Sequence, residues 1–92
     1  MPAESRVEKI FREEGKKQGA LVLKFLSPGF SGVPDRIVML RDGGIKFVEL
    51  KAPGEKPRPL QQRVFKKFAS YGWPVEVIDS VDKARAYWRE EE

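Results

Sequence analysis

The chain of 92 residues contains neither cysteine nor histidine. The lack of cysteine excludes disulfide bonds, thiolate metal sites and cysteine nucleophiles. The lack of histidine excludes catalytic triads and every zinc site that needs a histidine ligand. Any metal ion bound by this chain must therefore be held by oxygen atoms, and oxygen ligands are typical of Mg²⁺ and Mn²⁺.

Long apolar segments are also missing. No apolar run approaches the ~20 residues that cross a membrane, and the N-terminal sequence MPAESRVEK has no apolar signal core. We therefore expect an intracellular, cytoplasmic protein with no membrane partner. The length fits one domain, and because so small a core is marginal, association with a second subunit is expected.

Positive charge is concentrated in one part of the chain. Residues 51–73 carry six basic side chains and a single acid, Glu55, whereas residues 74–92 carry more acids than bases. A basic surface of this kind favours phosphate as a partner. The alternative is an ordinary solvated helix face, because runs of charge are usually solvated.

Hydrophobic spacing and turn-forming residues predict the element order α-β-β-β-α-β-α. The expected helices and strands cover residues 5–18, 20–26, 35–41, 45–51, 59–71, 73–79 and a last helix after Ser80. A strand–helix–strand crossover suggests that the third and fourth strands are parallel. We predict one α/β domain over residues 1–92, with a central mixed sheet flanked by helices. The apolar stripe expected on the second helix is Leu60, Val64, Phe68 and Tyr71.

The second and third strands form a predicted β-hairpin that is apolar on both faces, which is typical of the interior of a sheet. A three-residue turn at Asp42-Gly43-Gly44 would place Asp35 opposite Lys51 and Ile37 opposite Glu49. Asp35 and Glu49 would then be diagonal neighbours, with Cβ atoms ~7–8 Å apart.

Asp35, Glu49 and Lys51 interrupt an otherwise apolar face of this hairpin. Two carboxylates at that separation can bind one divalent cation, which acidifies water and polarises a phosphate. A neighbouring lysine can stabilise charge that develops on phosphorus, or orient or deprotonate an attacking water. The alternative is an ion pair between Asp35 and Lys51, worth ~0.2–1 kcal/mol, with Glu49 in solvent.

The segments GVPDR (residues 32–36) and FVELK (residues 47–51) resemble the PD-(D/E)XK nuclease motif. Together with APGEKPRPLQ and GWPVEVIDS, they more closely resemble the stand-alone VRR-NUC domains of phages and prophages, over about residues 5–82. The resemblance implies a restriction-endonuclease-like fold and cleavage of DNA with Mg²⁺ or Mn²⁺, in which a metal-activated water attacks phosphorus and leaves a 5′-phosphate. It implies that Asp35 and Glu49 are metal ligands and that Lys51 is the catalytic lysine.

Two further residues match the family pattern. Glu8 matches a metal-binding glutamate on the first helix, although Ser5-Arg6-Val7-Glu8 is also a capping-box pattern. Gln61 matches a catalytic glutamine at the start of the later helix, although a plain helix-start role is possible and Gln62 is adjacent. Contacts to DNA phosphates, with plain surface as the alternative, are expected from Lys24, Lys56, Arg58 and Arg63.

Stand-alone members of the family are similar to dimeric, structure-specific nucleases such as Holliday junction resolvases. We therefore expect a metal-dependent DNA endonuclease that acts on branched or duplex DNA as a homodimer. A non-catalytic nucleic-acid-binding module with the same fold is the main alternative, and the complete set of Asp35, Glu49 and Lys51 argues against it. A structural protein whose carboxylates form surface ion pairs is the third.

Overall fold

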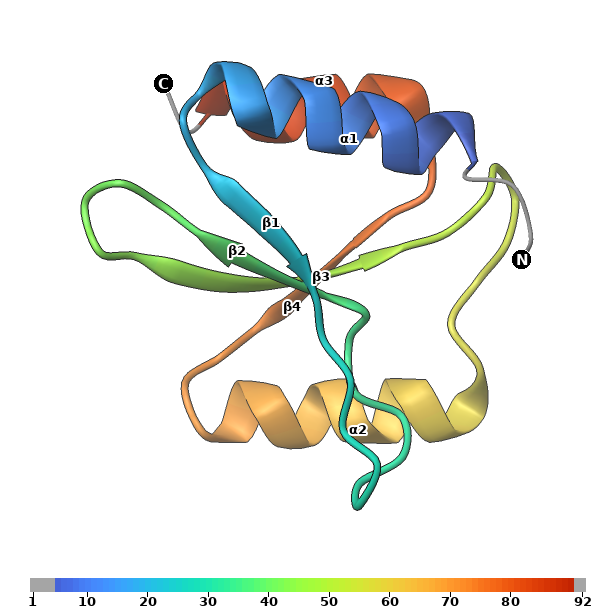
Figure 1. Cartoon of the computed structure of the whole chain (residues 1–92). Coiled ribbons are helices and arrows are strands. Elements are labelled where there is room, and N and C mark those ends of the chain that lie inside the picture. The colour runs from blue at the N-terminus through green and yellow to red at the C-terminus, as the bar shows by residue number, and fades with distance from the viewer. Residues whose placement is uncertain (1–4, 91–92) are drawn as a thin grey trace.

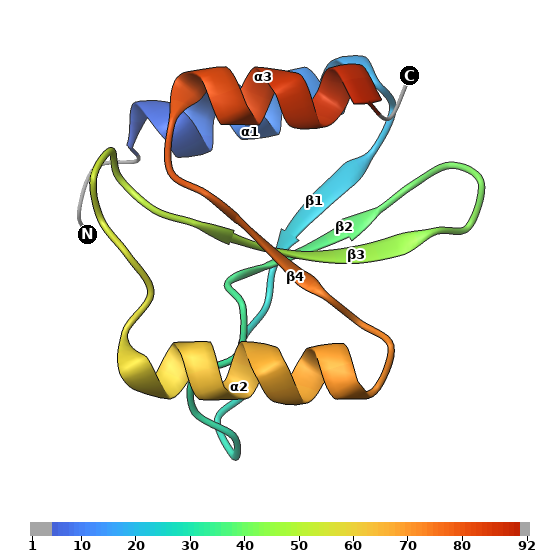
Figure 2. The same cartoon turned by 180° about the vertical axis from the view of Figure 1, so that it is seen from behind.

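The computed structural model describes residues 5–90, and its elements follow the predicted order. They are α1 (Arg6–Lys17), β1 (Leu21–Lys24), β2 (Arg36–Met39), β3 (Ile45–Leu50), α2 (Pro59–Ser70), β4 (Val75–Ile78) and α3 (Val81–Glu90). Helices α1 and α3 lie together on one face of the sheet, and α2 lies on the other (Figures 1 and 2). The predicted fold class, a mixed sheet between helices, is confirmed.

The four strands form one sheet in the order β1-β2-β3-β4. The pairs β1–β2 and β2–β3 are antiparallel, and β3–β4 is parallel, as the crossover through α2 requires. Strands β1, β2 and β4 are shorter than predicted. The chain leaves the β1–β2 ladder after the hydrogen bond from Phe25 N to Asp35 O (2.8 Å), because residues 27–34 form a loop with two prolines.

The predicted hairpin register is wrong by two residues. Arg36 pairs with Val48 and Ile37 with Phe47, rather than Ile37 with Glu49. The physical cause is the turn, in which Gly43 adopts the left-handed conformation (φ 93°) and Leu40 N donates to Gly44 O at 2.8 Å. The turn is therefore residues 41–43, with Gly44 already in the ladder. A shift of two keeps every side chain on its predicted face.

The main core lies between the sheet and the α1–α3 pair. Phe11 and Trp88 are almost fully buried there, with ring centroids 5.1 Å apart. Because strand side chains alternate between faces, Val38 and Val48 both point into this core. The residues of this core are Val7, Phe11, Val38, Val48, Leu50, Ile78, Ala84, Tyr87 and Trp88.

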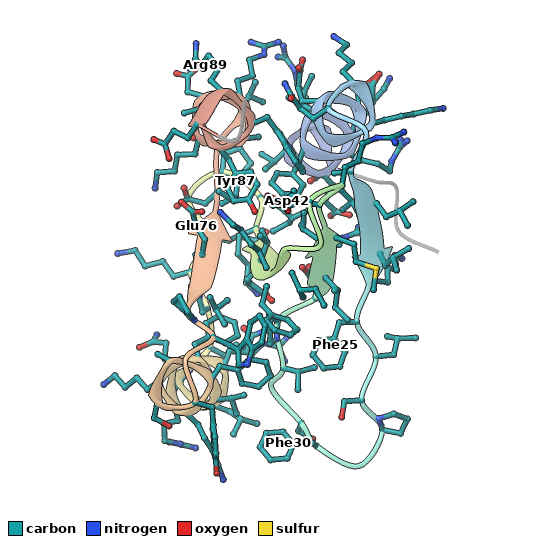
Figure 3. The ribbon with its side chains drawn as sticks, turned by 90° about the vertical axis from the view of Figure 1, so that its left-hand side faces the viewer. Phe25, Phe30, Asp42, Glu76, Tyr87 and Arg89 are labelled. Atoms are coloured by element: carbon teal, nitrogen blue, oxygen red, sulfur yellow. The ribbon has the colours of Figure 1, made fainter. Side chains whose placement is uncertain are left out.

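A smaller aromatic cluster lies between the sheet and α2. The ring of Phe47 on β3 packs edge-on against Phe68 of α2 (5.3 Å between centroids) and against Trp73 (5.6 Å). Figure 3 shows Phe25 pointing into the space between the sheet and α2. Val64 is the buried residue of the predicted α2 stripe, whereas Leu60 and Tyr71 are exposed, because they extend beyond the part of the helix that this cluster covers. The cluster fixes α2 under the end of β3.

Replacing Gly15 by alanine should destabilise the protein, because α1 packs closely against β1 and α3 at this position. A Cβ atom at Gly15 would lie 2.6 Å from Cζ2 of Trp88 and 3.0 Å from Cγ2 of Val22. Overpacking of this kind costs about 1–3 kcal/mol, which outweighs the gain of alanine over glycine in a helix. Gly15→Ala should lower Tm by roughly 5–15 °C in thermal denaturation.

Gly29→Ala is the matched control, because nothing lies within 4 Å of a Cβ at Gly29 and its φ is not positive. A Gly15→Ala protein as stable as the Gly29→Ala protein would contradict this account of the α1–sheet packing.

Candidate active site

The start of β2 and the end of β3 are joined by two reciprocal hydrogen bonds. Asp35 N donates to Oε1 of Glu49 (3.0 Å), and Leu50 N donates to Oδ1 of Asp35 (3.2 Å). Continuing the observed register by one residue places Asp35 directly opposite Glu49, not diagonal to it as predicted. The corrected register therefore brings the two predicted metal ligands closer together.

Glu49 is a charged residue that is only 2% exposed. Its second oxygen, Oε2, lies 3.1 Å from Nζ of Lys51 and accepts a hydrogen bond from Nε2 of Gln61 (3.0 Å). A buried carboxylate is tolerated only when it is paired and hydrogen-bonded. The backbone N of Asp35, Nζ of Lys51 and Nε2 of Gln61 together satisfy Glu49 and fix its orientation.

The side-chain amide of Gln61 links the site to the start of α2. Its Oε1 accepts hydrogen bonds from Nζ of Lys51 (3.2 Å) and from the backbone N of Arg58 (2.9 Å). The hydrogen bond from Arg58 N agrees with the helix-start role, and the contacts with Lys51 and Glu49 place Gln61 beside the predicted site residues. Its catalytic role stays a prediction. Gln62 instead donates to Pro57 O (2.8 Å), away from the carboxylates.

The pKa of the Asp35 carboxyl is raised from its ordinary value of 3.8 to about 6. Burial is the main cause, because it disfavours the charged form, and the negative charge of Glu49 adds to it. The hydrogen bond from Leu50 N acts in the opposite direction. The hydrogen bond from Leu50 N therefore does not fully offset the effects of burial and of the repulsion between the Asp35 and Glu49 carboxylates.

This donor set fits a divalent cation. Both ligands are hard carboxylate oxygens, and among the described residues Oδ2 of Asp35 has no hydrogen-bond partner. A cation beside Asp35 would oppose the electrostatic effect that raises its pKa. Within residues 5–90, however, no three acidic side chains are grouped closely enough to form a metal site by themselves. Further ligands would have to be backbone oxygens, water or substrate.

Glu8 does not join Asp35 and Glu49. Its backbone N donates to Oγ of Ser5 (3.1 Å), which caps α1, and its Oε2 lies 3.1 Å from an Nη atom of Arg36. Arg36 is a residue that the sequence reasoning missed. The sequence contains a pattern that points to Arg36. Strand alternation places it on the same face as the core residue Val38, and a buried charge on that face requires a partner of opposite charge.

The predicted phosphate contacts lie on the surface. All four basic side chains are exposed: Lys24, Lys56, Arg58 and Arg63. Lys24 is on the edge strand β1, opposite Arg36, and Arg58 directly precedes α2. Their role in DNA binding stays a prediction.

This chain is similar to known proteins over most of its length. The profile of the VRR-NUC domain matches residues 1–82. A protein of Acyrthosiphon pisum secondary endosymbiont phage 1, named "Putative nuclease p44", is 49% identical over 79 residues, which cover 86% of this chain and 85% of that protein. A solved structure titled "VRR_NUC domain" superposes with a TM-score of 0.85 at 35% identity and 95% coverage of both chains.

A mixed sheet that carries an aspartate, a glutamate and a lysine at the junction of two strands places this chain among nucleases of the PD-(D/E)XK type. The chain belongs to the VRR-NUC domain family, which confirms the resemblance seen in the sequence. No helix in the described residues is long and apolar enough to span a membrane.

Asp35→Asn should stabilise the metal-free protein at neutral pH. Because the pKa of Asp35 is raised in the folded state, its ionisation opposes folding. Below about pH 4, where Asp35 is protonated, this group does not oppose folding. As the pH rises through about 6, Asp35 ionises in the folded state and the free energy of unfolding falls. The loss is about 1–2 kcal/mol after allowing for solvent screening. In EDTA at pH 7.5 the asparagine variant, which keeps the Oδ1 acceptor, should melt several degrees higher than wild type.

At pH 4 the two proteins should melt at similar temperatures, and this comparison is the control for any general effect of the substitution. Equal melting temperatures of variant and wild type at pH 7.5 would show that the carboxylate pair is not repulsive.

Proposed function

We propose that this protein is a metal-dependent DNA endonuclease that hydrolyses phosphodiester bonds with Mg²⁺ or Mn²⁺. The observation that supports the proposal most strongly is the connected set of Asp35, Glu49, Lys51 and Gln61. A surface ion pair would not need a glutamate that is 2% exposed with three partners. The burial and contacts of Glu49 therefore support the proposal over a surface ion pair.

The side chains have separable roles in this proposal. Asp35 and Glu49 hold the cation, which supplies a Lewis acid that polarises the phosphate and acidifies water. Lys51, 16% exposed and oriented by Gln61, presents its ammonium group to the scissile phosphate and stabilises the charge that develops there, or orients the attacking water. The assignment of Glu8 as a further metal ligand stays a prediction.

The DNA is bound mainly through its phosphates in this proposal. The positively charged segment 51–73 includes Lys51 and the start of α2, so basic residues flank the site residues Lys51 and Gln61 in the sequence. Phosphate contacts position a nucleic acid without reading its sequence. We therefore propose specificity for DNA structure, as in Holliday junction resolvases, rather than for base sequence.

Cleavage of end-labelled DNA tests the proposal. The substrates are a four-way junction, a flap, a linear duplex and a single strand, each with Mg²⁺, Mn²⁺ or EDTA. Glu49→Gln and Lys51→Met should each reduce the cleavage rate by at least ~100-fold. Binding to the same DNA, measured by fluorescence anisotropy, should change by less than ~5-fold.

Lys83→Met is the control, because Lys83 lies on α3 and its ion-pair partner is Asp79 (2.8 Å), which is none of the four site residues. DNA binding by wild type without cleavage of any substrate would favour the alternative, a non-catalytic nucleic-acid-binding module. Cleavage retained in Glu49→Gln would refute the mechanism.

We further propose that the protein is a homodimer, and an exposed apolar face of the sheet supports this. Leu21 and Leu23 on β1 and Met39 on β2 are 58%, 42% and 39% exposed on the face opposite α1. Figure 3 shows α2 below β4, toward the edge of the sheet opposite β1, so among the described residues no helix covers these side chains. A contiguous exposed apolar patch on an edge strand is a typical association surface.

Leu23→Glu should convert the dimer to a monomer, because it places a charge in this apolar face. Light scattering coupled to size exclusion measures the mass. Tyr71→Glu is the control, since Tyr71 is 73% exposed at the end of α2 and lies outside the face. A monomeric wild-type protein, or a Leu23→Glu protein that stays dimeric, would refute this interface.

A further inference from the structure

An aromatic groove lies between α2 and the loop of residues 27–34. Its volume is about 420 Å³, within the ~300–1,000 Å³ of sites that bind small molecules. Two half-buried rings, Phe25 and Phe68, line it with their centroids 6.4 Å apart. Two further rings in its lining, Phe30 and Tyr71, are 44% and 73% exposed, and Figure 3 shows Phe30 on the α2 side of the loop. Exposed aromatic side chains gathered around one groove are typical of a binding site.

Positive charge borders the aromatic groove. Helix α2 carries Arg63, Lys66 and Lys67 and contains no acidic residue. Lys67 is part of the groove lining, and its Nζ lies 5.6 Å from the ring centroid of Phe30. Rings on which a base can stack, next to a cation that attracts its phosphate, are the features with which proteins bind single-stranded nucleic acid. An apolar peptide would use the rings but not the lysine.

The aromatic groove and the proposed active site are neighbours on the same two elements. Val33 lines the groove and is two residues before Asp35, which corresponds to at most ~7 Å of chain. Phe68 is seven residues after Gln61 on α2, which corresponds to about 10 Å along the helix. A nucleotide in the groove would therefore be close to the phosphate that is cleaved.

Packing between the loop and α2 fixes the shape of the groove. A Cβ atom at Gly32 would lie 2.9 Å from Cγ2 of Val64 and 3.2 Å from Cγ of Leu60. Pro28 and Pro34 further restrict the backbone of the loop. The loop side of the groove is therefore ordered before a ligand binds, which lowers the entropic cost of binding.

We propose that the aromatic groove binds an unpaired nucleobase of the DNA substrate, stacked against Phe30 and Tyr71, with Lys67 on an adjacent phosphate. The inference rests on the proposed nuclease function and gives its selectivity for DNA structure a physical basis. Bases within a duplex are paired and stacked on their neighbours, so they cannot enter the groove without being extruded. DNA that offers an unpaired nucleotide near the cleaved bond, such as a flap or an opened branch point, can fill it directly.

Fluorescence anisotropy in EDTA measures DNA binding without cleavage. The probes are an end-labelled flap DNA and a fully paired duplex of the same length. Wild type should bind the flap at least ~5-fold more tightly than the duplex, because the groove adds a stacked base. Phe30→Ala/Tyr71→Ala should weaken binding to the flap by about 5- to 30-fold and binding to the duplex by less than ~2-fold.

Three further variants separate stacking from general effects on the loop. Phe30→Trp keeps an aromatic face and should bind the flap as tightly as wild type. Phe30→Leu keeps apolar area without a ring and should bind the flap more weakly than wild type. Leu26→Ala is the matched control, because Leu26 is 81% exposed next to the loop and is not part of the groove lining. It should leave both affinities unchanged.

Equal affinity of wild type for the flap and the duplex, or a Phe30→Ala/Tyr71→Ala protein that binds the flap as tightly as wild type, would overturn the inference. If wild type still cleaves these DNAs with Mn²⁺, the proposed nuclease function survives that result. Flap binding through the groove without any cleavage would refute the nuclease function alone. Wild type that binds neither DNA would refute both.

A second copy of this chain is the other possible occupant of the groove. Light scattering of the Phe30→Ala/Tyr71→Ala protein should give the same mass as wild type. A mass that falls from dimer to monomer would assign the groove to the subunit interface and overturn the inference.

Discussion

The mutual hydrogen bonds between Asp35 and the Glu49–Leu50 segment hold two carboxylates together where their charges repel. Each carboxylate accepts a backbone N–H of the other's strand, so the sheet itself fixes their separation. Glu49 is stabilised further by Lys51 and Gln61, which leaves Asp35 with the raised pKa. A site that is electrostatically unsatisfied but geometrically rigid supports the proposal that Asp35 and Glu49 bind a cation.

The rest of the fold holds in place the contact between the start of β2 and the end of β3. The buried core under α1 and α3 fixes the central strands β2 and β3, and the aromatic cluster around Phe47 fixes α2 below them. Because α2 begins beside the end of β3, the amide of Gln61 reaches Glu49 and Lys51 while it also receives the backbone N–H of Arg58. One side chain thus couples the start of a helix to the geometry of the site.

Much of this arrangement could be predicted from the sequence, and the failures have physical causes. The order of elements and their faces follow from hydrophobic periodicity, which is a local property. The hairpin register depended on which residues form the turn, and Gly43 rather than Gly44 takes the left-handed position. Asp35, Glu49, Lys51 and Gln61 come together as predicted. The Glu8–Arg36 pair was not predicted, because it depends on how α1 packs on the sheet.

The central claim is that Asp35 and Glu49 hold a divalent cation. The most direct measurement is anomalous diffraction from a crystal of the protein soaked in Mn²⁺, recorded at the manganese absorption edge. The account predicts a peak about 2.0–2.3 Å from a carboxylate oxygen of Asp35 and of Glu49. A fully soaked crystal with no peak between these two carboxylates, or with its peak elsewhere, would contradict the account.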